Sequence, residues 1–150
     1  MRRFVSWVGV LALVWTTAVV AAAAQDKPSL EQLDRVMKKD GPAQQALVKA
    51  IVAGDQAAAK TNLATLQKGI AEAQTFWVAN KRTDALEFTK TVLNKLEGID
   101  KLLSAPKLDS TVALAAVQDL NKSCTECHKV YRTTDDSGHY ILKPGSVPGY

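Results

Sequence analysis

Hydrophobic positions recur along most of this chain at alternating intervals of three and four residues, and that period predicts α-helices. The pattern is clearest in the middle of the chain, where one seam of six apolar residues is formed by Ala59, Leu63, Leu66, Ile70, Ala73 and Trp77. This spacing places all six on one face of a helix, which we expect to run from Asp55 to Ala79. No segment shows the apolar–polar alternation that is typical of strands.

The first predicted helix begins at Ser29. Gln32 follows three residues later, and the pair fits a capping box. Gly41-Pro42 interrupts the helix, and we expect a kink or a break there because proline cannot donate to the helical hydrogen-bond ladder. The helix then resumes and stops near Gly54.

Two further helices follow a polar turn. Asp84, with Glu87 three residues later, opens the third helix, and Pro106 ends it. Its apolar stripe consists of Leu86, Leu93, Leu96 and Leu103. Asp109 or Ser110 caps the fourth helix. The seam of that helix consists of Ala113, Val117, Leu120, Cys124, Cys127 and Tyr131.

Four apolar seams joined by short connections predict an all-α domain over residues 25–133, an antiparallel up-down-up-down four-helix bundle. Residues 134–150 are rich in glycine and proline, so we expect an irregular tail on the surface. Removing such a tail should leave the bundle intact.

Residues 1–24 have the features of an export signal. Arg2 and Arg3 precede an almost unbroken apolar run, and Ala22-Ala23-Ala24 supplies a small-residue cleavage site. We therefore expect cleavage near Ala24 and a periplasmic protein without stable membrane insertion. The alternative is an uncleaved anchor, because the 21 residues from Phe4 to Ala24 are just long enough to span a bilayer.

The charge of the chain does not indicate nucleic-acid binding. The formal net charge is +4, and removal of Arg2 and Arg3 with the signal would leave about +2. No basic stripe with interleaved aromatic residues is present, and such a stripe would mark a nucleic-acid surface.

The most specific motif is Cys124-Thr125-Glu126-Cys127-His128, the C-x-x-C-H pattern of covalent c-type haem attachment. Two thiols three residues apart on a helix lie on one face, so both can add to the vinyl groups along one porphyrin edge. His128 follows directly and can bind the iron. The motif therefore predicts one covalent haem c.

Three other interpretations of the motif are less favoured. A disulfide between Cys124 and Cys127 would strain a helix and would not explain His128. A dithiol redox motif is expected in a βαβ setting, and the sequence shows no such pattern. A zinc site would have to recruit His139 as well, with a ligand spacing that is poor for a zinc finger.

A C-x-x-C-H motif on the last helix of a four-helix bundle resembles the class II c-type cytochromes, the cytochrome c-prime family. The resemblance covers residues 29–132, and Cys124 to Arg132 is similar to the family signature C-x-x-C-H-x-x-[YF]-R. It implies thioether bonds at Cys124 and Cys127 and proximal ligation of iron by His128. It also implies that Arg132 lies near a haem propionate.

Members of this family differ in whether a sixth ligand binds the haem iron. Met37 has a setting similar to that of low-spin members, in which a methionine of the first helix binds the iron; otherwise its thioether packs over the haem. His139 is a less favoured sixth ligand. Members often have an arginine four residues before this methionine, where this chain has Leu33, and Arg35 falls on another face.

His128 and Met37 together would saturate the iron, and methionine ligation raises the reduction potential. The expected function is single-electron transfer to and from periplasmic redox partner proteins, without enzymatic activity. The alternative is a five-coordinate gas-binding protein that takes nitric oxide. The resemblance also implies a possible homodimer through the first two helices.

Overall fold

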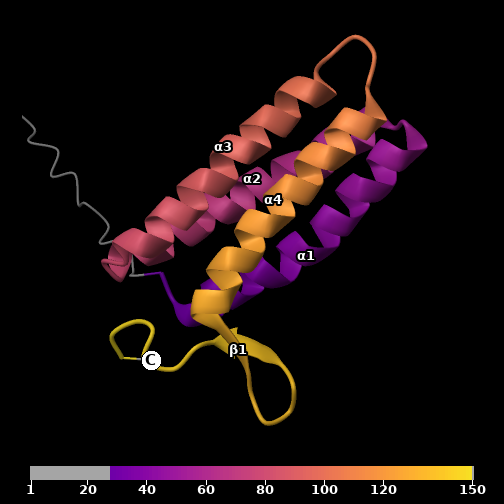
Figure 1. The fold of residues 1–150 in the computed structure, drawn as a ribbon. Helices are drawn as coiled ribbons and strands as arrows, with labels where there is room; N and C mark the ends of the chain where they lie inside the picture. Colours follow the sequence, from indigo (N-terminus) through magenta and orange to yellow (C-terminus); the bar gives the residue numbers. More distant parts are fainter. Residues whose placement is uncertain (1–27, 150) are drawn as a thin grey trace, which may run out of the picture.

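The computed structural model describes residues 28–149, and they form four α-helices that lie side by side (Figure 1). The helices are α1 (Leu30–Ala53), α2 (Gln56–Ala79), α3 (Thr83–Leu103) and α4 (Ser110–Tyr131). Each helix contacts the next along the chain, and α4 also contacts α1. The predicted all-α four-helix bundle is therefore confirmed.

The predicted signal segment, residues 1–24, lies outside the described residues. Among the helices within residues 28–149, none is both long enough and apolar enough to cross a bilayer.

Side-chain caps fix the beginnings of three helices. The side-chain oxygens of Ser29, Asp55 and Asp109 each accept a hydrogen bond from the backbone N–H three residues later, as a helix N-cap does. The expected beginnings of α1, α2 and α4 are thus confirmed. The third helix begins at Thr83, one residue before the expected Asp84, and has no side-chain cap.

The helix α1 passes through Pro42 without a break, so of the expected kink or break, the break is wrong. Pro42 is exposed, as is Lys38, whose carbonyl loses its helical partner to the proline ring. Water can solvate that carbonyl on the outer face of the helix. On the inner face, Val36 before the proline and Ala43 and Leu47 after it are all buried, so packing supports α1 on both sides of Pro42.

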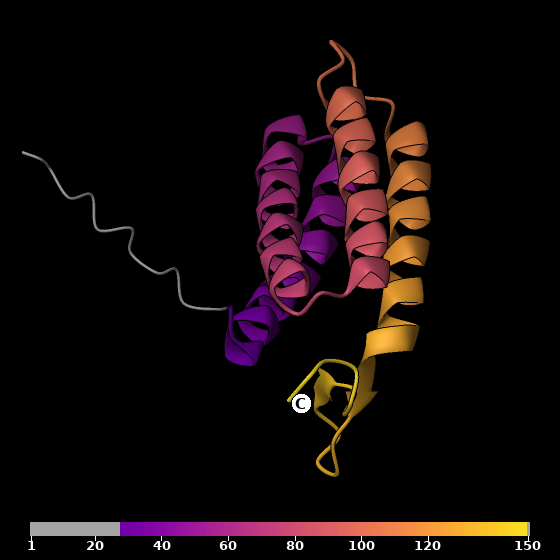
Figure 2. The ribbon, with the colours of Figure 1, turned by 90° about the vertical axis from the view of Figure 1, so that its left-hand side faces the viewer.

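One end of the bundle holds the α1–α2 and α3–α4 connections, residues 54–55 and 104–109, and we call it the closed end (Figure 2). The Gln56 side chain donates to the carbonyl of Ala105 at 2.8 Å, and the Ser110 hydroxyl donates to the carbonyl of Ile51 at 3.0 Å. An aliphatic core fills this end, and its almost fully buried members include Leu47, Ile51, Leu63, Ile99, Leu103 and Val117.

The opposite end holds the start of α1, the α2–α3 turn, the end of α4 and the C-terminal tail, and we call it the open end (Figure 2). Its core is aromatic. The ring of Trp77 meets that of Phe76 edge-on, with centroids 5.0 Å apart, and lies 4.7 Å from that of Tyr131. The smaller buried side chains around these rings are Leu33, Ala73, Ala85 and Val147.

The prediction of an irregular tail is wrong. Strands β1 (Arg132–Thr134) and β2 (Tyr140–Leu142) form an antiparallel ribbon directly after α4. Farther along, Val147 is only 3% exposed and packs into the aromatic core of the open end. A buried valine thus helps to tie the tail to the bundle, which the composition of the tail did not indicate.

Candidate functional site: a cavity at the open end

A cavity of about 1040 Å³ lies at the open end and is lined by all four helices and the tail. This volume is at the upper end of the range for small-molecule and cofactor sites, roughly 300–1000 Å³. Most of its wall is apolar and is formed by Leu33, Leu66, Ile70, Trp77, Phe88, Val92, Leu96, Leu120 and Leu142. The cavity can therefore enclose a large, mainly apolar molecule.

Helix α4 contributes the three residues of the predicted attachment motif to one wall. Cys124, Cys127 and His128 are all half-buried and all line the cavity. Both thiols are free. Burial raises the pKa of Cys124, and it raises the pKa of Cys127 to about 11. The wall therefore favours neutral sulfur over thiolate.

The imidazole of His128 is held in its neutral form. Burial lowers the pKa of His128, and the positive charge of Arg132 lowers it further. A neutral imidazole keeps the nitrogen lone pair with which histidine binds a metal ion. Its donor chemistry therefore suits the role that the sequence predicts.

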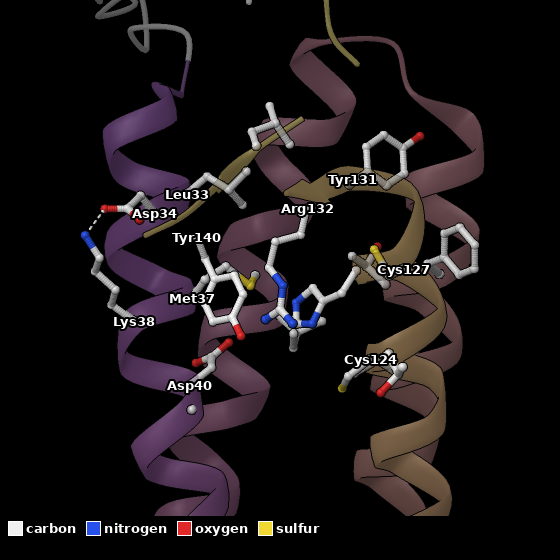
Figure 3. Close-up of a pocket in the computed structure, with 18 of the residues that line it drawn as sticks. Leu33, Asp34, Met37, Lys38, Asp40, Cys124, Cys127, Tyr131, Arg132 and Tyr140 are labelled. Carbon is white, nitrogen blue, oxygen red and sulfur yellow. Dashed lines mark hydrogen bonds and ion pairs between the residues drawn. The ribbon is translucent and has the colours of Figure 1, made fainter. Parts of the chain in front are cut away.

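Met37 lines the cavity from helix α1. It is half-buried, and Figure 3 shows its side chain across the opening from Cys124 and Cys127. The cavity thus separates a thioether on α1 from two thiols and an imidazole on α4. Leu33 is buried on the same face of α1, whereas Arg35 is exposed, as expected from its place on another face.

Arg132 and Tyr140 lie between these two walls (Figure 3). The guanidinium carbon of Arg132 is 4.0 Å from the centre of the Tyr140 ring, a cation–π contact. His139 also lines the cavity, but it is exposed, and its Nδ1 atom lies 3.6 Å from a carboxylate oxygen of Asp135. The tail thus supplies polar groups to the mouth.

A hydrogen-bond network anchors the end of α4 beside the cavity. The Tyr131 hydroxyl donates to Asp84 and accepts from Arg82 at 2.8 Å, and Arg82 also pairs with Asp84 at 3.0 Å. Arg82 donates further to the carbonyl of Ser146 in the tail. Burial and the hydrogen bond to Asp84 raise the pKa of Tyr131 to about 12, so the hydroxyl keeps its proton.

Asp40 is a second functional group on the α1 wall. It lines the cavity, and its Oδ2 atom is buried with no hydrogen-bond partner among the described residues. A Cβ atom at Gly69 on α2 would collide with both carboxylate oxygens, so the missing side chain at position 69 makes room for the carboxyl. Burial, with a smaller contribution from Glu72, raises the pKa of Asp40 to about 7.

The structure brings all five predicted site residues to one cavity: Met37, Cys124, Cys127, His128 and Arg132. The sequence analysis missed Asp40 and Gly69, although each has a signal. Asp40 continues the inward spacing of Leu33 and Met37, so an acid falls on an apolar stripe. Gly69 lies inside a helical seam, where glycine is unfavourable unless another group approaches closely.

Among residues 28–149, no three His, Cys, Asp or Glu side chains gather as a ligand set for a metal ion. Comparison of the chain with protein-family models, with curated proteins and with solved structures finds no match in any of the three.

Proposed function

We propose that this protein is a periplasmic single-electron carrier with one haem c in the open-end cavity. The haem would supply a one-electron Fe(III)/Fe(II) couple. In this proposal the bundle has the up-down-up-down order, and its redox partners are other periplasmic proteins. The protein would bind no substrate and catalyse no reaction of its own.

One observation carries the proposal. The C-x-x-C-H motif faces an apolar cavity of cofactor size, and the only methionine of the described residues lies on the opposite wall. A structural disulfide would need no such cavity. A dithiol oxidoreductase would need an accessible low-pKa thiol, whereas burial raises the pKa of both thiols here.

The residues of the cavity would divide the work of holding the cofactor. Cys124 and Cys127 would attach it through thioethers, which are neutral and suit a buried wall. The neutral imidazole of His128 would bind the iron from α4, and the thioether of Met37 would bind it from α1. Arg132 carries the positive charge at the mouth and would pair with a propionate.

The remaining wall would exclude water and limit motion around the redox centre. Trp77, Phe88 and the aliphatic side chains of all four helices enclose the cavity. A rigid, dry surround is what a protein contributes to cofactor-based electron transfer. The tail would cover the mouth through Tyr140 and Leu142.

The first experiment asks whether haem is present and covalent. Protein exported by a host with a cytochrome maturation system should keep one haem per chain after acid–acetone extraction. Replacement of Cys124 and Cys127 by serine should make the haem extractable. Haem that is lost from the unaltered protein would overturn the proposal.

The second experiment asks whether Met37 binds the iron. The unaltered protein should show low-spin absorption bands and little carbon monoxide binding. Met37→Ala should give high-spin bands and rapid carbon monoxide binding, whereas Arg35→Ala, on the exposed face of the same helix, should change neither. If the unaltered protein is high-spin and binds gas readily, the carrier is wrong and the gas-binding alternative takes its place.

A further inference from the structure

Asp40 is an acid in a cavity wall that is mostly apolar. Its Oδ2 atom is buried, and no donor among the described residues reaches it. A buried carboxylate without a partner is unfavourable, because the charged form loses its hydration. The neutral acid avoids that cost, so this position favours a carboxyl group that holds a proton.

The bundle makes room for this carboxyl group. The oxygens of Asp40 are turned toward Gly69 on α2, where any Cβ would collide with them. Gly69 is buried within a regular helix, so its lack of a side chain is not required by a turn. The glycine therefore positions the carboxyl group of Asp40 in the wall.

No cation among the described residues forms an ion pair with Asp40. On α1, Lys38 pairs with Asp34 at 2.7 Å. On α2, the facing charge is Glu72, which is negative and lies 3.9 Å from Lys68. The other titratable groups that line the cavity are Glu31 on α1, Cys124, Cys127, His128 and Tyr131 on α4, and Arg132, His139 and Tyr140 in the tail.

Helix α3 contributes only uncharged side chains to the cavity: Phe88, Thr89, Val92 and Leu96. The protonation of Asp40 is therefore set by its burial, by the negative charge of Glu72 and by any charge that enters the cavity.

We propose that Asp40 is a proton-binding site that couples proton uptake to electron uptake in the cavity. This inference rests on the proposed electron-carrier function. One electron would come from a redox partner protein, and one proton would pass from solvent to Oδ2 of Asp40. Both would leave on reoxidation, so the net charge of the cavity would be the same in the two states.

The direction of this coupling follows from electrostatics. Burial raises the pKa of Asp40 to about 7, so the group is poised to change its protonation near neutral pH. An added electron makes the cavity more negative, and a negative charge favours the neutral form of a carboxyl group. By linkage, the reduction potential must then fall as the pH rises.

The test is potentiometry of the haem-loaded protein between about pH 6 and about pH 8. Full coupling of one proton to one electron lowers the potential by about 59 mV for each tenfold fall in proton concentration. Asp40→Asn should flatten this dependence. Glu97→Gln, which removes an exposed carboxylate of α3 that does not line the cavity, should leave the dependence as it is.

A second pair of variants tests the geometry without removing the acid. Gly69→Ala should displace the carboxyl group of Asp40 from its buried position and reduce the pH dependence. Gly98→Ala is the matched control, because a Cβ at that helical glycine of α3 meets nothing within 4 Å. It should leave the pH dependence unchanged.

Infrared difference spectra give a readout that does not depend on the potential. Reduced-minus-oxidised spectra should show a carboxylic-acid carbonyl band that disappears in Asp40→Asn. A pH-independent potential in the unaltered protein, or a slope that survives Asp40→Asn, would overturn the proton site while the haem and its bands remain. Absence of haem would instead overturn the proposed function.

Discussion

At the closed end, leucine, isoleucine, valine and alanine fill the space between the four helices, and few polar groups are buried. At the open end, the same four helices surround a cavity, and aromatic rings with a hydrogen-bond network hold the surrounding elements together. The two ends therefore differ in what occupies the middle of the bundle, although they share every helix.

This difference indicates a division of roles along the bundle axis. A fully buried aliphatic side chain contributes roughly 1.5–3 kcal/mol to folding, and the closed end holds most of the described ones. The open end has fewer of them and includes Asp40, an acid without a partner. We infer that the closed end provides stability that lets the open end carry a cavity and an unfavourable buried group.

The largest expected effect comes from two buried leucines of α1, one at each end of the bundle. Leu47 and Leu33 are both buried on α1, but only Leu33 lines the cavity. Leu47→Ala should lower the free energy of unfolding by about 2–5 kcal/mol, measured by urea titration, and leave the absorption bands of the proposed haem unchanged. Leu33→Ala should cost less stability and shift the bands. Equal stability losses, or shifted bands in Leu47→Ala, would contradict the division.

A smaller effect is expected from the tail. Val147→Ala should lower the free energy of unfolding by about 1–2 kcal/mol, because it removes a buried contact to the aromatic core. Ile141→Ala is the control within the same tail, since Ile141 is 39% exposed, and it should change stability little. If removal of residues 135–150 leaves the melting temperature unaltered, the tail does not support the open end.

The smallest effect concerns the acid dependence of the network at the open end. Hydrogen bonds from Arg82 and Tyr131 hold the pKa of Asp84 well below its usual range. A carboxyl group with a lowered folded-state pKa stabilises the fold fully above its unfolded pKa of about 3.8. That contribution declines below this value and is lost only as the pH falls through the lower folded-state pKa. Asp84 is largely exposed, so we expect less than about 1 kcal/mol.

Urea titrations at about pH 7 and about pH 3 measure this contribution. Asp84→Asn should be less stable than the unaltered protein at the higher pH, and the difference between the two should narrow at the lower pH. Glu97→Gln, an exposed acid on the same helix, serves as the control and should follow the unaltered protein at both. A difference between Asp84→Asn and the unaltered protein that is equally large at both pH values would assign the effect to packing rather than to charge.

Much of the fold could be predicted from the sequence, because its signals are local. Caps such as Ser29 and Asp109 mark where helices begin, and a regular apolar seam marks the inward face of α2. The error at Pro42 has a tertiary cause, since packing on both sides of the proline outweighs one lost hydrogen bond of the helix. The face of α3 was only partly predicted, because Thr89 is buried and Leu86 only partly so.

The site could be predicted only where its residues belong to a motif. Cys124, Cys127 and His128 are adjacent in the sequence, so their joint orientation follows from one helix. The room for Asp40 depends on Gly69 of another helix, and the place of Val147 depends on how the tail turns back after β2. Such pairings between distant segments carry no periodic signal.

The order of the elements along the chain has a consequence for biogenesis. Helix α4 is the last helix to be synthesised, and it is also the one that closes the bundle against α1. The same helix carries Cys124 and Cys127, which are half-buried in the folded bundle. An enzyme that modifies the two thiols would therefore reach them more easily before α4 docks than after it.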